Sequence, residues 1–272
     1  MKLIATLAVA AVLAGCNATK PSSTAPSSSG IFNKINTGNA GEWSNKYRCS
    51  GEVQSVPEAG TIIFKASKNK CGAASQRSEI ISRIWHQNEK KKLVLTANVA
   101  IDADIPFNKY GKPLSFRTTL FQVASMTTGC NPAASFTINS NGGTRTYTGY
   151  KHKRGANPTN ITSTCTHTST SGPEETDSKS VIPMDGTPFD LKVEYDFMGK
   201  GAFEYVVYVN GERVDAFKFE RPIIATSNKE FKLKFGLYSG PFSTYYPYTM
   251  TVKNFRVDKV DKLSDEFNAA FN

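Results

Sequence analysis

The feature that most constrains this chain's fold is a succession of short runs in which apolar and polar residues alternate, separated by Gly, Pro and Asn. A period of two residues is typical of β-strands, whose successive side chains point to opposite faces of a sheet. We find no convincing amphipathic helical pattern of more than a few turns. The sequence therefore predicts an all-β fold.

The clearest local signal is a β-hairpin. Residues 204–209 and 213–219 flank Asn210 and Gly211, a dipeptide that readily adopts the positive φ angles of a tight hairpin turn. Similar patterns predict further strands at 61–65, 77–85, 93–101, 116–124, 190–195, 230–238 and 248–257, a long polar loop at 139–180 and a short closing helix at 263–271. Strands of this number and spacing favour a sandwich of two antiparallel sheets.

The N-terminus predicts export and lipidation. Residues 1–15 carry an early cation, an apolar stretch and two small residues before Cys16, as in a cleavable signal peptide. The run 13–16 also resembles the bacterial lipobox, which implies a lipid on Cys16 that anchors the protein to a membrane. Asn17 favours the outer membrane over the inner one, on the periplasmic or cell-surface side. An ordinary secretory signal with an incidental cysteine is the alternative.

The rest of the chain divides into a tether and one domain. Residues 16–30 are mostly Ser, Thr, Pro and Ala and cannot bury enough apolar surface to order themselves. Residues 31–272 form the expected domain, which we take to be a monomer. Four cysteines remain besides Cys16, and an exported protein favours two disulfides over a metal site, because there is no Cys-x-x-Cys motif and there are three His. Of three possible pairings we favour the local one, Cys49 with Cys71 and Cys130 with Cys165.

The charge of the chain suggests its partner. The formal net charge is +10 and falls to +9 when Lys2 leaves with the signal peptide, which suits a polyanion. Nucleic acid is disfavoured for an exported, tethered domain without a recognisable module. A glycoside hydrolase is also disfavoured, because the acid pairs Glu175–Asp177 and Glu194–Asp196 lack the third carboxylate of a Glu-x-Asp-x-x-Glu pattern.

Alternation predicts which polar side chains share a face. In residues 230–238 the apolar positions face the core, so Lys232, Lys234 and Tyr238 share the opposite face. Arg77 and Glu79 lie two residues apart and share a face in the same way, close enough to pair. The alternative for Lys232, Lys234 and Tyr238 is an ordinary solvated surface. The alternative for Arg77 and Glu79 is an ordinary cross-strand salt bridge.

A third polar position, Gln122, ends an apolar strand. A regular strand places Gln122 on the side of Thr118, with residues 117, 119 and 121 opposite. Such a glutamine is either structural, with hydrogen-bond partners in the core, or looks into a polar groove.

These three places together resemble motifs of the β-jelly-roll polysaccharide lyases, a group that includes alginate and glucuronan lyases and heparin-lyase-like proteins. Residues 77–80 read Arg-Ser-Glu-Ile, residues 120–122 read Leu-Phe-Gln, and residues 234–238 read Lys-Phe-Gly-Leu-Tyr, in the family's order. The resemblance spans roughly residues 45–258 and implies a concanavalin-like β-jelly-roll sandwich. One departure is that Ala124 stands where alginate lyases have the histidine of Gln-Ile-His, and His86 is the candidate replacement.

The resemblance implies β-elimination on a uronic-acid polymer, without a cofactor. Arg77 and Gln122 would neutralise the sugar carboxylate as charge develops on it. Either His86 or Tyr238 would take the C5 proton, and Tyr238 would protonate the leaving oxygen. Strict alternation puts His86 on the side opposite to Arg77, so a bulge or turn near Trp85 must intervene if His86 takes part.

Other residues are candidates for holding the acidic polysaccharide. We expect substrate contacts from Glu79, Lys232, Lys234, Tyr150, His152, Arg154 and Tyr246. His152 is also the second choice for a base, and its loop is equally compatible with a solvated cover. A non-catalytic lectin that binds an acidic polysaccharide at the cell surface is the main alternative function, and a structural surface protein is a further one.

Overall fold

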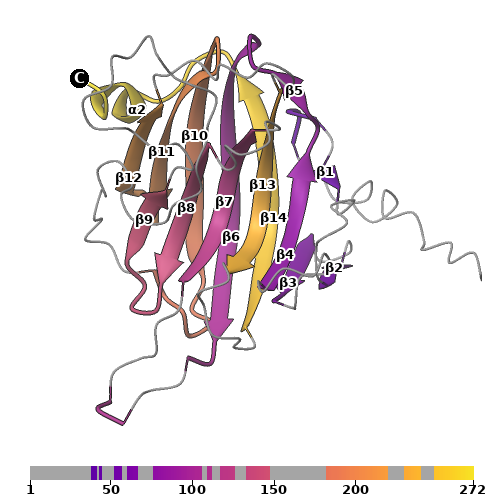
Figure 1. Ribbon diagram of the computed structural model, residues 1–272, viewed down its shortest axis with the longest axis vertical. Helices are drawn as coiled ribbons and strands as arrows, with labels where there is room; N and C mark the ends of the chain where they lie inside the picture. The colour runs from indigo at the N-terminus through magenta and orange to yellow at the C-terminus, as the bar shows by residue number, and fades with distance from the viewer. Residues whose placement is uncertain are drawn as a thin grey trace, which may run out of the picture.

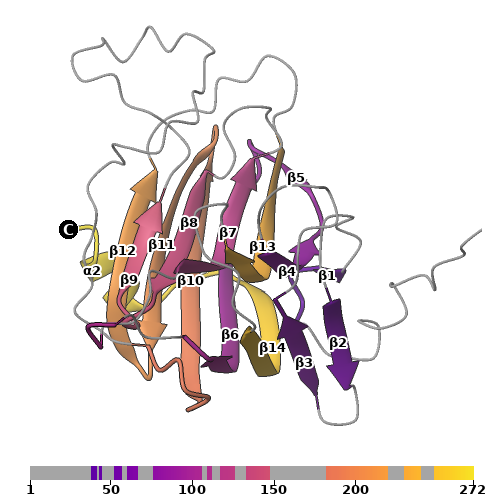
Figure 2. The same ribbon diagram turned by 60° about the horizontal axis from the view of Figure 1, so that its bottom comes forward.

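The computed structural model describes residues 38–41, 43–44, 52–56, 60–66, 76–105, 109–111, 117–125, 133–147, 182–219, 230–239 and 248–272. These residues form two antiparallel sheets packed face to face (Figures 1 and 2). Sheet I contains, in spatial order, β1 (Trp43–Ser44), β4 (Gln76–Ser82), β13 (Glu230–Ser239), β7 (Arg117–Ser125), β8 (Ala134–Asn139) and β9 (Thr144–Tyr147), with β5 (Trp85–His86) also paired to β13. Sheet II contains β12 (Glu212–Phe219), β11 (Ala202–Val209), β10 (Phe189–Gly199), β6 (Lys90–Ala103), β14 (Tyr248–Val260), β3 (Thr61–Lys65) and β2 (Glu52–Val56).

The connectivity is that of a jelly roll. The late strand β13 lies between the early strands β4 and β7, and β14 lies between β3 and β6. Late strands inserted between early ones require connections that cross between the sheets, as in jelly rolls. The predicted β-jelly-roll sandwich is confirmed.

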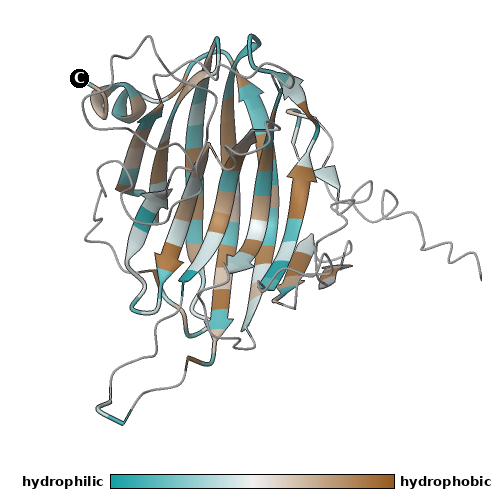
Figure 3. Cartoon of the chain, viewed as in Figure 1, coloured by the Kyte–Doolittle hydropathy of each residue, from teal (hydrophilic) through white to brown (hydrophobic). Residues whose placement is uncertain are grey.

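The core lies between the sheets and is rich in aromatic rings. Alternation along the strands is visible as bands of opposite hydropathy (Figure 3). The apolar set of β13 is buried as predicted, and Phe235 packs against Phe255 of sheet II with ring centroids 4.8 Å apart. Phe121 of β7 likewise meets Tyr205 of β11 edge to face at 5.4 Å. Such pairs add about 0.5–1.5 kcal/mol each to the free energy gained by burial, so they hold the two sheets in one arrangement.

The predicted hairpin is also present. Asn210 and Gly211 connect β11 to β12 with φ angles of 51° and 84°. Two consecutive positive φ angles are the mark of the type I′ turn, whose twist matches that of the flanking strands.

Some predicted boundaries were wrong. The strand expected at 77–85 is interrupted after Ser82, and β5 begins at Trp85. The polar loop expected at 139–180 contains β9, and β8 just before it was missed. In β9 the core-facing residues include Thr144 and Thr146, and the Thr146 hydroxyl lies 2.6 Å from the Tyr205 hydroxyl and donates to Asp215. Because both threonines are polar, hydrophobic alternation did not reveal the strand.

The closing helix is α2 (Asp265–Ala269), which packs on the outer face of sheet II. Ser264 caps it by accepting a hydrogen bond from the Phe267 backbone N–H at 3.1 Å. Phe267 is buried beside Val206 and Tyr208 of β11. Within the described residues no helix is long and apolar enough to cross a membrane.

Candidate active site

Three adjacent strands of sheet I bring most of the predicted site residues together. β13 lies between β4 and β7, and its register pairs Tyr238 with Arg77 and Lys234 with Gln122. Directly paired residues in an antiparallel sheet point to the same face. The outer face of sheet I, which turns away from sheet II, therefore carries these four residues, and also carries Glu79 and Lys232.

Arg77 is the centre of this group. Its guanidinium carbon lies 4.2 Å from the centroid of the Tyr238 ring, a cation–π contact. Its Nε lies 3.3 Å from Glu79 Oε2, an ion pair that lacks the alignment of a hydrogen bond. Arg77 is 8% exposed and Glu79 1% exposed. The guanidinium is thus held between a carboxylate and an aromatic ring, which fixes its orientation.

Two lysines make this face strongly cationic. Lys234 is 2% exposed, and burial together with Arg77 lowers its pKa, whereas Glu79 opposes that shift. Burial, and then the neighbouring Lys234, also lowers the pKa of Lys232. This group of described residues thus holds three cations, Arg77, Lys232 and Lys234, and one carboxylate, Glu79. Such a face favours an anionic ligand.

A glycine lets β4 and β13 approach closely at this point. Gly236 is paired with Glu79 and has a φ of 141°. A Cβ atom added here would lie 2.3 Å from the Ser78 carbonyl oxygen, which no side chain tolerates. The glycine of the motif thus permits the strand contact that places Glu79 among the cations.

An irregularity in β7 changes the predicted faces. Thr119 pairs with Tyr238 and Gln122 pairs with Lys234, with a register shift between them. Gln122 therefore shares the outer face with Thr119, and the expectation that it lies on the side of Thr118 was wrong. Thr118 faces the core, where its hydroxyl lies 3.2 Å from the Tyr248 hydroxyl. A regular period of two cannot foresee such a shift.

His86 lies apart from this group. The strand is interrupted at Arg83 and Ile84, between β4 and β5. His86 then pairs with Glu230 of β13 and therefore faces the outer side of sheet I. However, Glu230 is eight residues from Tyr238, or about 27 Å along an extended strand. His86 is exposed, and its Nδ1 accepts a hydrogen bond from the Asn88 backbone N–H at 3.2 Å. The expected replacement for the family's histidine is therefore not beside Arg77, and Ala124 occupies the position opposite Lys232.

Some predictions lie outside the described residues. They are the contacts from Tyr150, His152, Arg154 and Tyr246, the lipid on Cys16 and the pairing of Cys49, Cys71, Cys130 and Cys165. They stay predictions.

Sequence reasoning missed the polar residues of β8 beside the group. Ser135 pairs with Gln122, and Thr137 pairs with Thr119, so both extend the outer face of sheet I. Both are buried. The signal was the alternation of Ala134, Phe136 and Ile138 with polar residues, which marks β8 as a half-polar strand.

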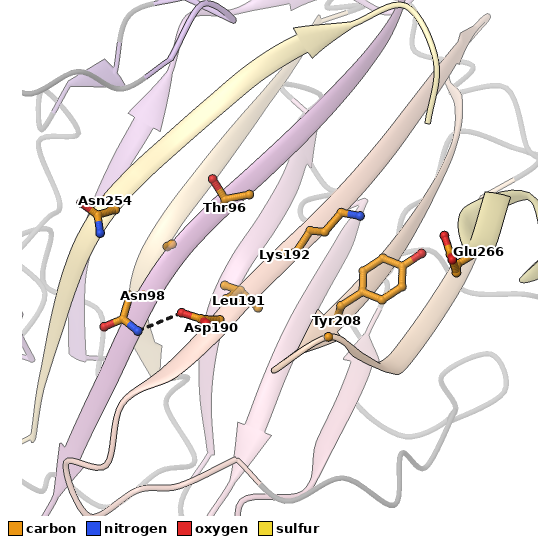
Figure 4. Close-up of a pocket in the computed structure, with 10 residues that line it drawn as sticks. Thr96, Asn98, Asp190, Leu191, Lys192, Tyr208, Asn254 and Glu266 are labelled. Atoms are coloured by element: carbon orange, nitrogen blue, oxygen red, sulfur yellow. Dashed lines mark hydrogen bonds between the residues drawn. The ribbon is translucent and has the colours of Figure 1, made fainter. Parts of the chain in front are cut away.

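A cavity of about 560 Å³ lies on the opposite side of the molecule, on the outer face of sheet II (Figure 4). Its lining includes Lys192 together with Asp190 and Glu266, and Asn98 donates a hydrogen bond to Asp190 at 2.9 Å. This cavity contains none of the predicted site residues, and its lining carboxylates outnumber its lining cations. Size alone therefore does not identify the site for an anionic ligand, and the chemistry favours sheet I.

Across the described ranges, no cluster of three or more His, Cys, Asp or Glu side chains is arranged to hold a metal ion.

Comparison with known proteins gives likenesses of fold. No protein-family model and no curated protein sequence matches this chain. Among solved structures it is similar to the marine PL7 alginate lyase AlyA1 from Zobellia galactanivorans, with 14% identity, 82% of this chain and 86% of that chain covered, and a TM-score of 0.47. It is also similar to alginate lyase A1-II′ of polysaccharide lyase family 7, with 11% identity, coverages of 78% and 83%, and a TM-score of 0.48. The binding domain of botulinum neurotoxin DC is similar at 14% identity, with 82% of this chain and 45% of that chain covered and a TM-score of 0.41.

Proposed function

We propose that this protein is a polysaccharide lyase that cleaves a uronic-acid polymer by β-elimination on the outer face of sheet I. The observation that carries the proposal is that Arg77, Tyr238, Lys234 and Gln122, from three adjacent strands, lie on one face of sheet I, with Arg77 in contact with Tyr238. A uronic-acid polymer presents a carboxylate on each acidic sugar. Arg77, Lys232 and Lys234 on this face are cations that suit that charge.

The group supplies what the carbanion-forming step needs. Removal of the C5 proton moves an electron pair into the adjacent carboxylate, which becomes an enediolate. Arg77 and Lys234 are cations, and the Gln122 side-chain amide is a neutral donor, all on the face where that charge would develop. Donors held in place in a site that excludes water stabilise such charge by several kcal/mol, of the order of 3 kcal/mol for one donor.

Tyr238 is the proton-transfer group in this proposal. The Tyr238 side-chain oxygen accepts the C5 proton, the C4–oxygen bond breaks, and Tyr238 returns the proton to the leaving oxygen. The products are an unsaturated sugar end and a new hydroxyl end, with no net change at Tyr238. The Arg77 guanidinium, 4.2 Å from the ring centroid, holds the tyrosine on the substrate side of the sheet.

A lectin is the second candidate, and one observation favours it. Ala124 lies opposite Lys232 and His86 is remote, so the described residues place no imidazole beside Arg77. A cationic face without a sufficient base would bind an acidic polysaccharide and release it unchanged.

The test is ultraviolet absorbance during incubation with alginate, polyglucuronate, hyaluronate and heparin-type glycans, because elimination creates a conjugated double bond. We expect absorbance to rise with at least one polymer and the rate to fall by at least about 100-fold in Tyr238→Phe. Tyr110→Phe is the matched control, since Tyr110 also has a cation near its ring, Lys109 at 5.0 Å, but is 75% exposed. Saturable binding of a polymer without any rise in absorbance would replace the lyase by the lectin.

A further inference from the structure

A row of directly paired residues crosses five adjacent strands of sheet I. The strands β4, β13, β7, β8 and β9 lie side by side in this order (Figure 1). Their registers pair Arg77 with Tyr238, Tyr238 with Thr119, Thr119 with Thr137, and Thr137 with Arg145. Directly paired residues of an antiparallel sheet point to the same face. The row therefore lies on the outer face of sheet I and has an arginine at each end.

The spacing of the row suits a polysaccharide that crosses the strands. Neighbouring strands lie about 4.8 Å apart, so Arg145 is about 14 Å from Tyr238 and about 19 Å from Arg77 along the row. The strand spacing is close to the length of one sugar residue in a polysaccharide. A chain laid along the row would therefore bring to Arg145 a sugar about three residues from the one at Tyr238.

The two long side chains of the row beyond Arg77 are the ones that present surface to a ligand. Tyr238 and Arg145 are half-buried, whereas Thr119 and Thr137 between them are buried. The Thr137 hydroxyl donates a hydrogen bond to the Arg145 backbone carbonyl at 2.9 Å, which ties β8 to β9 at this point. The stretch of the row between Tyr238 and Arg145 is thus uncharged, and Arg145 adds a cation at its far end.

An arginine is suited to this position for one of two reasons. Its planar guanidinium can hold a carboxylate through two parallel hydrogen bonds, and a uronic-acid polymer carries further carboxylates along its chain. Alternatively, β9 is the last strand of sheet I among the described residues, and a charge on an edge strand discourages pairing with another chain. The second role needs no ligand, so the two can be separated by experiment.

We infer that Arg145 binds the carboxylate of a second acidic sugar, about three residues from the one at Tyr238, and so selects long chains over short oligosaccharides. The inference rests on the proposed function for the place of the first sugar, but it concerns binding and not proton transfer. Arg117 offers a contrast, because it is exposed on the same outer face. It pairs with Asn139, two residues along β7 from Thr119, and therefore lies outside the row.

Calorimetry with the Tyr238→Phe protein tests this inference, because binding is then measured without appreciable cleavage. The probes are trisaccharides and hexasaccharides of alginate, polyglucuronate, hyaluronate and heparin-type glycans. For at least one polymer we expect the hexasaccharide to bind about tenfold more tightly than the trisaccharide, because only the longer chain reaches from position 238 to the charged hydrogen-bond donors of Arg145.

Three substitutions in the same protein test the residue itself. Arg145→Gln should reduce the ratio of hexasaccharide to trisaccharide affinity by about fivefold or more. Arg145→Lys keeps the charge but not the planar fork, so it should lose less. Arg117→Gln is the matched control and should change the ratio by less than about twofold, as expected for an exposed cation that makes no direct contact. Retained trisaccharide binding in each variant would show that the sheet is folded.

Two results would overturn the inference. One is equal affinity for the trisaccharide and the hexasaccharide of every polymer, or a ratio that Arg145→Gln leaves unchanged, which would leave Arg145 the edge-strand role. The other is an equal loss in Arg117→Gln and Arg145→Gln, which would mean that only net charge matters.

The absorbance test of the native protein separates this inference from the proposed function. Length-dependent binding that needs Arg145, without any rise in absorbance, would exclude the lyase and support the second carboxylate site. A rise in absorbance together with length-independent binding would support the lyase and exclude that site.

Discussion

Glu79→Gln should destabilise the protein far more than the loss of an ordinary salt bridge. Glu79 is 1% exposed and is the carboxylate that balances Arg77, Lys232 and Lys234 on the outer face of sheet I. The substitution keeps the size and shape of the side chain and removes its charge. Three buried cations, Arg77, Lys232 and Lys234, would then lie beside a neutral amide in place of the Glu79 carboxylate.

The structure sets the expected magnitude. The side chains of the Arg77–Glu79 pair are 10% and 2% exposed, so the figure for a buried pair applies. Removing one partner of such a pair costs about 3–5 kcal/mol. The matched control is Glu204→Gln in sheet II, because the Lys218–Glu204 pair has the same separation of 3.3 Å but side chains 44% and 13% exposed. Its loss should cost less than about 1 kcal/mol.

The pH dependence adds a second readout. Burial lowers the pKa of Lys234 in the native protein below its ordinary value of 10.5. At pH values between the native pKa and the unfolded pKa of Lys234, the unfolded chain therefore binds more protons than the native protein. Stability therefore rises with pH across that window. Glu79 opposes this lowering of the Lys234 pKa. Glu79→Gln should therefore lower the native pKa of Lys234 further and extend the pH window to lower values. The deficit of the variant should be largest near neutral pH and should shrink as pH rises toward 10.5.

Urea unfolding followed by circular dichroism, at several pH values from 6 to 10, would measure both effects. A loss at pH 7 no greater than that of Glu204→Gln would refute the view that Glu79 compensates buried cations. A deficit that stays constant with pH would refute the role given to Lys234.

Two further predictions concern the same sheet. Gly236→Ala should cost at least about 1–3 kcal/mol in thermal unfolding, because its Cβ would overlap the Ser78 carbonyl oxygen and force β4 from β13; a variant as stable as the native protein would show that the strands can separate freely here. His86→Ala should leave the rate of absorbance increase within about twofold of the native rate, since His86 is about 27 Å from Tyr238 along β13; a loss like that expected for Tyr238→Phe would place His86 in the chemistry.

Local patterns in the sequence predicted much of what the structure contains. The alternation in residues 230–238 predicted that Lys232, Lys234 and Tyr238 share a face opposite the buried apolar set, and the register of β13 agrees. Asn210 and Gly211 predicted the hairpin for the same kind of reason. The shared face and the hairpin turn both follow from the backbone geometry and conformational preferences of residues adjacent in the sequence, so they can be predicted without knowledge of the tertiary structure.

Only the tertiary structure decided which of these residues meet. The pairing of β13 with β4 and β7 brings Arg77 to Tyr238 and Gln122 to Lys234 across long separations in sequence. The register shift in β7 moves Thr119 to the outer face, and the turn after Ser82 carries His86 away. Register is set by hydrogen bonds and packing between strands, and a one-residue shift reverses the faces. The alternation within a single strand therefore determines which of its side chains share a face. The neighbouring strands and their register determine which residues of other strands lie beside them.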